Sequence, residues 1–279
     1  MRKRRSAREL ESIASRAAPA HRARTAAGYG EALAMLSRRG LRPEQTAREA
    51  PCQLEDPMAD RFSLWLGHYA FRLFLRGAIQ KASGFAPADT TRYLTKGQSR
   101  NYAEVLVDLG LAHRIARGRY ALEWPAQSFG GILEWYVARE LRRRFGFDVA
   151  TGVKLHVRGA GGDLDVVAAA EGKLVYVELK SSPPKNLAAS EIAAFCGRLS
   201  LLRPDVALFV VDTALRLSDK VLPMLEEEFV RRGYAFFRPK PIAGQLWALT
   251  PHVYAVNGSR DLMANIGKAI AAGFLALSP

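Results

Sequence analysis

The segment GGDLDVVAAAEGKLVYVELKSS, residues 161–182, constrains the fold more than any other part of the sequence. Two runs rich in Val, Leu and Ala flank the dipeptide Glu171-Gly172, a pattern that predicts two antiparallel strands joined by a tight turn. With a two-residue turn, Ala170 faces Lys173, and this one pair sets the register of the whole hairpin. A longer loop would shift every pair.

In that register, charged residues lie opposite one another on the part of the strands far from the turn. Asp165 faces Glu178 and Asp163 faces Lys180, and all four side chains share one face of the sheet. Two directly opposed carboxylates repel unless a proton or a cation lies between them. The pattern therefore favours a bound divalent cation such as Mg²⁺, which prefers carboxylate oxygens and water. A surface ion pair between Asp163 and Lys180, with the other acids solvated, is the alternative.

The hairpin belongs to a segment in which helical and strand patterns alternate, from residue 127 to the end. The run VALFVVDT is continuously apolar and is typical of a strand buried on both faces. Mixed strands with flanking helices predict an α/β domain of three layers. The expected strands lie near 149–158, 163–170, 173–182 and 206–213, in YAFFRP (234–239) and within 246–257, and the expected helices at 131–144, 188–202, 217–232 and 260–276.

Glu134 is a further candidate, because it lies on the apolar stripe of the helix at 131–144. Its neighbours at helical spacing are Val137, Ala138, Leu141 and Phe145. A carboxylate among apolar side chains is costly unless something compensates its charge. On the helix at 188–202, by contrast, Glu191 and Arg198 fit an ordinary solvated face better than a site.

The region before residue 127 is mainly helical. Its apolar spacing predicts a helix over 60–83, a short helix near 89–94, a helix from Gln98 to Leu109, and then two short strands around the basic tip Arg117-Gly118-Arg119. This order resembles a winged helix-turn-helix, whose second helix and wing contact nucleic acid; such modules also serve as protein-binding or spacer units. The resemblance implies these contact residues: Lys96, Gln98, Ser99, Arg100 and Asn101 on the helix, and Arg114, Arg117 and Arg119 on the wing.

Charge and composition narrow the class of protein. The net charge is +14, and residues 1–50 hold 12 Lys or Arg against 5 Glu, so a polyanion such as nucleic acid is the expected partner. Cys52 and Cys196 lack metal-ligand or disulfide-framework spacing and fit a reducing cytoplasm. We expect a cytoplasmic protein without a membrane partner, since no apolar run is long enough to span one and MRKRR does not open a signal peptide.

Together these residues resemble the PD-(D/E)xK, or restriction-endonuclease-like, superfamily over about residues 127–240. In that family a helix Glu precedes a central hairpin whose first strand carries a metal-binding Asp and whose second carries an ExK pair, here in VELK. The stretches GGILEWYVARELRRRFGF, GGDLDVV and LVYVELKSS are also similar to the nuclease domains of CRISPR-ancillary effectors, and their spacing to resolvase-like nucleases. The segment before the winged helix is too short for the ligand-sensing domain of those effectors, so cyclic-nucleotide activation is not expected.

The resemblance implies a fold, a site and an activity. The fold is a restriction-endonuclease-like three-layer α/β domain with a mixed sheet at 127–279, preceded by a basic helical arm at 1–58 and a winged-helix domain at 59–126. Glu134, Asp165, Glu178 and Lys180 would be catalytic. The ligands of Mg²⁺ or Mn²⁺ would be Asp165, Glu178, the Leu179 carbonyl and Glu134, with Asp163 competing with Asp165 because neither is preceded by Pro.

The activity would be metal-dependent hydrolysis of phosphodiester bonds, with Lys180 orienting or deprotonating the attacking water. DNA is favoured over RNA because winged helices more often bind duplex DNA. A DNA-binding or architectural protein that keeps the fold without turnover, and an RNA-processing endonuclease, are the alternatives. Many such nucleases act as dimers, which leaves a homodimer possible.

Overall fold

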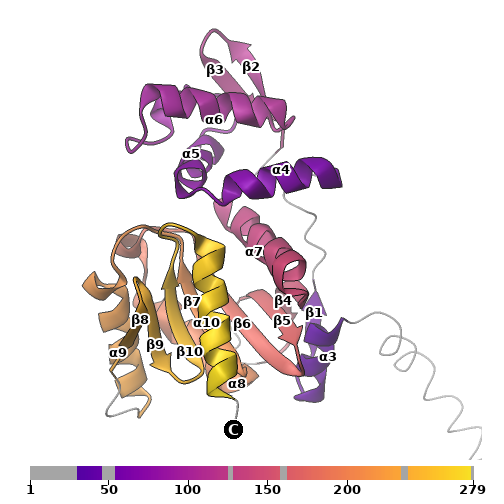
Figure 1. Cartoon of the computed structure of the whole chain (residues 1–279), viewed down its shortest axis with the longest axis vertical. Helices are drawn as coiled ribbons and strands as arrows, with labels where there is room; N and C mark the ends of the chain where they lie inside the picture. The colour runs from indigo at the N-terminus through magenta and orange to yellow at the C-terminus, as the bar shows by residue number, and fades with distance from the viewer. Residues whose placement is uncertain (1–29, 46–53, 125–127, 158–161, 234–237, 278–279) are drawn as a thin grey trace, which may run out of the picture.

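A single mixed sheet of eight strands organises the larger part of the molecule. The computed structural model describes residues 30–45, 54–124, 128–157, 162–233 and 238–277. The strand order is β1-β4-β5-β6-β7-β10-β9-β8, and in the described chain the parallel neighbours are β6 with β7 and β7 with β10 (Figure 1). The bounds are β1 Pro43–Gln45, β4 Asp148–Leu155, β5 Leu164–Ala170, β6 Lys173–Lys180, β7 Val206–Val211, β8 Lys240–Ala243, β9 Leu246–Thr250 and β10 Val253–Asn257.

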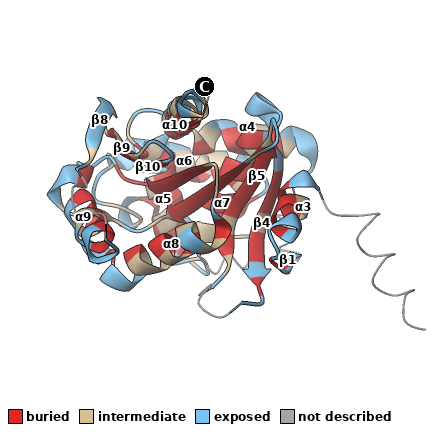
Figure 2. Ribbon diagram, turned by 90° about the horizontal axis from the view of Figure 1, so that it is seen from below, coloured by how far each residue is buried: buried red, intermediate tan, exposed pale blue. Residues whose placement is uncertain are grey.

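Helices cover both faces of this sheet, and strand alternation decides which residues meet which layer. Val166 and Ala168 of β5 join one apolar cluster, whereas Val167 and Ala169 join the other. Figure 2 shows the strands as a buried layer between the helices. The first cluster includes α7 (Phe129–Phe145) and α10 (Leu262–Ala276), and the second includes α3 (Glu31–Arg38), α8 (Ala189–Leu202) and α9 (Val221–Arg231). The α/β class predicted from the sequence is confirmed.

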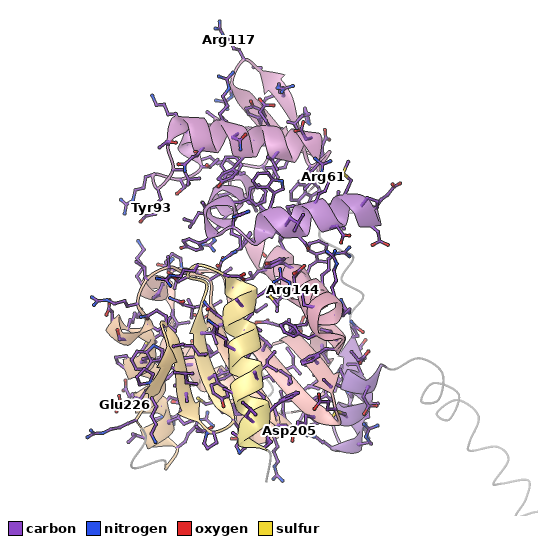
Figure 3. The ribbon with its side chains drawn as sticks, viewed as in Figure 1. Arg61, Tyr93, Arg117, Arg144, Asp205 and Glu226 are labelled. Atoms are coloured by element: carbon purple, nitrogen blue, oxygen red, sulfur yellow. The ribbon has the colours of Figure 1, made fainter. Side chains whose placement is uncertain are left out.

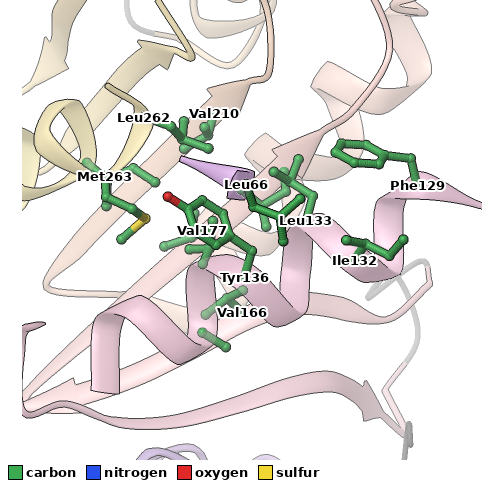
Figure 4. Packing of buried hydrophobic residues seen from close by; sticks show 14 of the residues in the cluster. Leu66, Phe129, Ile132, Leu133, Tyr136, Val166, Val177, Val210, Leu262 and Met263 are labelled. Atoms are coloured by element: carbon green, nitrogen blue, oxygen red, sulfur yellow. The ribbon is translucent and has the colours of Figure 1, made fainter. Parts of the chain in front are cut away.

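A smaller helical module stands on one end of the α/β part (Figure 1). It comprises α4 (Asp56–Leu66), α5 (Tyr69–Ile79), the 3₁₀ turn η1 (Pro87–Asp89), α6 (Lys96–Asp108) and the ribbon of β2 (Ala112–Ala116) and β3 (Arg119–Leu122). Figure 4 shows Leu66 of α4 packed with residues of α7 and of the sheet, among them Leu133 and Val177. The module and the α/β part therefore share one apolar core.

The single helix predicted over 60–83 is wrong, because the chain breaks at Gly67 and His68. The Arg72 guanidinium reaches back and donates hydrogen bonds to the carbonyls of Leu66 (2.6 Å) and Gly67 (3.1 Å), which ends α4. The next predicted helix also differs: residues 87–89 form only a 3₁₀ turn.

The third helix of the module starts two residues earlier than predicted. Thr95 and Gln98 form a reciprocal capping box, in which the Gln98 N–H donates to Thr95 Oγ1 at 3.2 Å. This cap places the first turn of α6 at Lys96.

Residues 31–45, expected within a basic arm, belong instead to the α/β part. β1 pairs with β4, and the backbone N–H of Ala32 in α3 donates to Asp148 Oδ2 at 2.7 Å. The basic segment 1–29 lies outside the described residues. No helix in the described chain is both long and apolar enough to cross a membrane.

Two differences from prediction concern the C-terminal third. Residues 246–257 form two antiparallel strands, β9 and β10, rather than one, because Pro251 and His252 turn the chain. The helix expected at 217–232 is divided into the 3₁₀ turn η3 (Leu217–Asp219) and α9. Most of the strand expected at 234–239 lies outside the described residues, whereas β7 is buried at every position, as predicted.

Candidate active site

The β5–β6 hairpin has the two-residue turn that the register argument required. Glu171 (φ 51°) and Gly172 (φ 70°) both adopt the left-handed region, as two-residue hairpin turns favour. Ala170 pairs with Lys173, and the ladder continues in that register to Val166 and Val177. Asp165 and Glu178 are the next residues on each strand, so the predicted approach of these two positions is confirmed at the level of the backbone.

Past the last pair of the ladder, the Asp165 side chain bridges the strands. Its Oδ2 accepts a hydrogen bond from the backbone N–H of Leu179 at 2.7 Å. In antiparallel pairing the N–H and C=O of one residue point to the same neighbouring strand, so the Leu179 carbonyl also faces the β5 side. Asp163 precedes β5, whereas Asp165 lies within it and accepts a hydrogen bond from β6, so Asp165 is the better placed of the two Asp residues.

Glu178 is buried and held by cations on both carboxylate oxygens. Its Oε1 lies 2.9 Å from Lys180 Nζ, and its Oε2 lies 2.5 Å from Arg198 Nη1 and also accepts from the Tyr176 hydroxyl. Burial would raise the pKa of Glu178, but the charges of Lys180 and Arg198 and the Tyr176 hydrogen bond together lower it. Glu178 is therefore ionised at neutral pH.

Asp165 has the opposite balance of charges. Burial, followed by the negative charges of Glu178 and Glu134, raises its pKa to about 7, against the hydrogen bond from Leu179 and the charge of Lys180. Three carboxylates thus lie close enough to affect one another, and the cations that neutralise Glu178 do not fully neutralise Asp165. A perturbed carboxylate of this kind is typical of functional sites, although structural ion pairs also produce such shifts.

Lys180 lies between two carboxylates at the end of β6. Its Nζ is 2.9 Å from Glu178 Oε1 and 3.1 Å from Glu191 Oε1 of α8. Burial lowers the pKa of Lys180, but the neighbouring Glu178 and Glu191 outweigh this effect and raise it. Lys180 therefore keeps its proton at neutral pH and suits charge stabilisation and water orientation rather than deprotonation of water.

Glu134 lies on the inner face of α7, as the apolar stripe predicted. Its side chain is 9% exposed, and its neighbours Val137, Ala138 and Leu141 are buried. The first turn of the same helix lies beside the end of β6, since a Cβ at Gly130 would come 4.0 Å from Ser181 Oγ. α7 therefore brings the Glu134 carboxylate toward Asp165, from the helical layer that also contains α10.

Two charged residues of α8 also face the site, although the sequence favoured solvent for both. Arg198 is 6% exposed and pairs with Glu178, and Glu191 pairs with Lys180. Seven residues separate them, which puts both on one helix face together with Phe195, which is fully buried. That shared face, with a large aromatic residue at its centre, was the available signal that it points inward.

The negative charge of the candidate ligands suits a hard divalent cation. Among the described residues, no group of three or more His, Cys, Asp or Glu side chains is arranged to hold a metal ion between them. Mg²⁺ commonly binds through only one or two protein carboxylates and completes its shell with water and substrate phosphate. Asp165 and Glu178 supply two carboxylates, and the under-neutralised charge of Asp165 is what a cation there would offset. To bind the cation, Glu178 would have to give up part of its contact with Arg198.

The residues expected to contact nucleic acid are exposed, with one exception. Ser99 is fully buried, so its expected exposure is wrong: it lies on the same face of α6 as the buried residues Ala103 and Leu106. Gln98 caps α6, and Arg114 pairs with Glu104. Lys96, Arg100, Asn101, Arg117 and Arg119 are exposed. Figure 3 places Arg117, at the tip of the ribbon, at the end of the module far from the α/β part.

A buried ion-pair cluster fixes the module over the carboxyl ends of the parallel strands. Asp212, the residue after β7, is fully buried, with its Oδ1 2.9 Å from Arg72 Nη2 and its Oδ2 2.8 Å from Arg76 Nη2. Arg72 is also fully buried and donates to the carbonyl of Gly258, just after β10, at 3.3 Å. The cluster lies at the same sheet edge as Lys180, because Asp212 N–H donates to the Lys180 carbonyl. In open α/β sheets this edge is where ligands bind.

No protein-family model and no curated protein matches the sequence. The solved structures similar to the chain include the following two. The crystal structure of protein VC1899 from Vibrio cholerae aligns with a TM-score of 0.50 and 14% identity, over 87% of this chain and 62% of that one. The structure of Can2 from Sulfobacillus thermosulfidooxidans in complex with cyclic tetra-adenylate aligns with a TM-score of 0.47 and 15% identity, over 86% and 61%. The chain therefore shares the α/β fold of VC1899 and spans about three fifths of the length of either protein.

Proposed function

We propose that this protein is a divalent-metal-dependent nuclease of the PD-(D/E)xK type that hydrolyses phosphodiester bonds, in DNA rather than RNA. The observation that carries the proposal is the approach of Asp165 to Glu178 and Lys180, with the pKa of Asp165 raised to about 7. A protein that only binds a polyanion gains nothing from clustered carboxylates beside the phosphate, because they repel it.

In this proposal Asp165 and Glu178 hold Mg²⁺ or Mn²⁺, with the Leu179 carbonyl and Glu134 at the edge of the site. The cation, when bound, would polarise a phosphoryl oxygen and lower the pKa of a bound water. Lys180, protonated between Glu178 and Glu191, would donate hydrogen bonds to the phosphate and stabilise the negative charge that develops in the transition state. Glu191 positions the Lys180 ammonium.

The winged helix-turn-helix assignment belongs to the same proposal. The three helices α4, α5 and α6 followed by the two-stranded ribbon support this assignment, and the exposed residues Lys96, Arg100 and Asn101 lie on α6. Exposed cations on a helix contact the phosphates of a nucleic acid in a salt-dependent manner. A homodimer stays a prediction.

A second candidate, a nucleic-acid-binding protein without turnover, is favoured by one observation. Arg198, 2.5 Å from Glu178, supplies the positive charge that a metal ion would otherwise bring. The nuclease proposal predicts cleavage when a divalent cation is added, whereas a binding protein without turnover should not cleave with it.

The deciding experiment is cleavage of supercoiled, linear, branched and single-stranded DNA, and of RNA, with Mg²⁺, with Mn²⁺ and with EDTA. Wild type should cleave only with metal, and Lys180→Ala should lose about 100-fold or more in rate, as expected for removal of one charge-stabilising donor. Lys240→Ala, in the exposed edge strand β8, is the matched control. Equal cleavage by wild type and Lys180→Ala, or tight binding with no cleavage by either, would refute the nuclease assignment. Cleavage of RNA alone would favour the RNA-processing alternative.

A further inference from the structure

Tyr93 is an exposed aromatic residue with no structural role in the core. It lies in the turn between η1 and α6, and 68% of its surface is open to solvent. Among the described residues, the large apolar side chains that are exposed include one other aromatic, Phe145 (39% exposed), and that ring packs against Phe147. A single exposed aromatic side chain is common on protein surfaces and by itself indicates no ligand, so what distinguishes this ring is the charge around it.

Positive charge holds and surrounds the Tyr93 side chain. Arg92 Nη2 donates to the Tyr93 hydroxyl at 3.0 Å, and the guanidinium lies 5.0 Å from the ring centroid. The hydrogen bond and the charge of Arg92 lower the pKa of the Tyr93 hydroxyl, and the Lys185 ammonium has a smaller effect in the same direction. Arg92 therefore contacts the ring directly, and the Lys185 ammonium, from a distant part of the chain, is near enough to act on the Tyr93 hydroxyl.

Lys185 lies close in the chain to the candidate active site. It lies in the 3₁₀ turn η2 (Pro184–Asn186), five residues after Lys180 at the end of β6. Lys220 holds this turn, since its Nζ donates to the carbonyls of Lys185 (2.8 Å) and Leu187 (3.0 Å). Figure 3 shows Tyr93 projecting from the helical module toward the α/β part, whereas Arg117 points away from it.

We propose that Tyr93, Arg92 and Lys185 form a binding subsite for one unpaired nucleotide of the substrate strand, on the side of the active site that faces the helical module. The base stacks on the Tyr93 ring, and Arg92 and Lys185 neutralise the flanking phosphates. An aromatic platform beside cations is how proteins hold single strands, because every base offers a π-face once it is unstacked. A base inside an intact duplex is covered by its neighbours and cannot stack on the ring.

This inference rests on the proposed function for its substrate, but its test does not need catalysis. Binding of a fluorescently labelled single strand of about 15 nucleotides, within the range that one binding module covers, is measured by anisotropy in EDTA. Tyr93→Ala should weaken binding by about 5- to 150-fold, the range expected for the loss of one stacked base. Tyr93→Phe, which keeps the ring, should bind like wild type. Blunt duplex of the same sequence should bind Tyr93→Ala and wild type equally.

Leu275→Ala, at an exposed position of α10 (74% exposed), is the control for removing an exposed apolar side chain. The subsite is refuted if wild type does not bind the single strand, or if Tyr93→Ala binds it as tightly as wild type does. An equal loss in Tyr93→Phe, or an equal loss on duplex, also refutes it, because neither is stacking of an unpaired base. Binding that depends on Tyr93 in a protein that never cleaves would overturn the proposed function and leave the subsite standing.

Discussion

The Arg198 guanidinium lies 2.5 Å from Glu178 Oε2, and both side chains are almost completely buried. Glu178 is the ExK carboxylate of the candidate site, and Arg198 comes from the helix that follows the hairpin. The charge of this metal-ligand candidate is therefore already compensated, whereas that of Asp165 is not. Glu178 depends on Lys180 and Arg198 for its ionised state in the interior, and Arg198, which stays charged, depends on Glu178 as its counter-ion.

Removing Arg198 should destabilise the protein strongly. Arg198→Met leaves Glu178 buried with Lys180 as its remaining cation, and breaking a buried pair on one side costs about 3–5 kcal/mol. Urea unfolding at pH 7.5 measures the loss, and Arg198→Met/Glu178→Gln should recover part of it because no unpaired charge remains. Arg117→Ala, at the exposed tip of the ribbon, is the control. A loss below about 1 kcal/mol for Arg198→Met, the range of surface pairs, would contradict the buried pair.

Asp165→Asn should stabilise the metal-free protein above neutral pH. The folded-state pKa of Asp165 is about 7, whereas an unfolded Asp titrates near roughly 3.9. Between these values the folded protein keeps a proton that the unfolded chain releases, so the free energy of unfolding of wild type falls as pH rises and the loss is complete above about pH 7. Asn carries no charge to repel Glu178 and Glu134, and its side-chain oxygen can still accept from Leu179.

The measurement is urea unfolding in EDTA from pH 4 to pH 8. The advantage of Asp165→Asn over wild type should be largest at pH 8 and should shrink by up to about 1.4 kcal/mol per pH unit below pH 7. The exposed Asp108→Asn controls for loss of one carboxylate. A variant that is less stable than wild type at pH 8 would show that the Asp165 charge is compensated after all.

Breaking the buried ion-pair cluster beneath the helical module should destabilise the protein as much as removing Arg198. Asp212→Ala leaves Arg72 buried without its counter-ion, and we expect a loss of about 3–5 kcal/mol in urea unfolding. Arg72→Met/Asp212→Leu should recover much of it. Glu31→Gln breaks the exposed pair with Arg38 (side chains 51% and 59% exposed) and should cost less than about 1 kcal/mol. Equal effects at the two pairs would argue against a structural role for the buried cluster.

Local signals in the sequence were enough to predict the hairpin and the close approach of its carboxylates. Glu171-Gly172 between alternating strands is a strong turn signal, and it determines the register that brings Asp165 to Glu178. The stripe around Glu134 likewise predicted a buried carboxylate on α7. In both cases the deciding contacts are between residues near in sequence or on one face of one element.

Tertiary contacts decided what the sequence could not predict. The break after α4 depends on Arg72, whose position is fixed by Asp212, 140 residues later in the chain. Arg198 was expected in solvent because an Arg on a helix usually lies there, and only the closeness of Glu178 across layers makes its burial favourable. The sequence around Arg198 offers only Phe195, on the same helix face, as a sign that this face points inward, and nothing local identifies Glu178 as the partner.

Gly77 should prove essential for the placement of Tyr93. It lies within α5 against the turn that leads to Tyr93, and a Cβ there would come 1.9 Å from the Thr90 carbonyl oxygen. Because that neighbour is backbone, Gly77→Ala must push the turn away from α5, at a cost of about 1–3 kcal/mol or more for overpacking. We expect lower stability in urea unfolding together with weaker binding of the single-stranded oligonucleotide. Gly97→Ala, in the first turn of α6, meets no atom within 4 Å and should leave both measurements close to wild type. If Gly77→Ala lost stability and still bound the single strand like wild type, the position of this turn would not matter for binding, and Tyr93 would have to act without fixed support from α5.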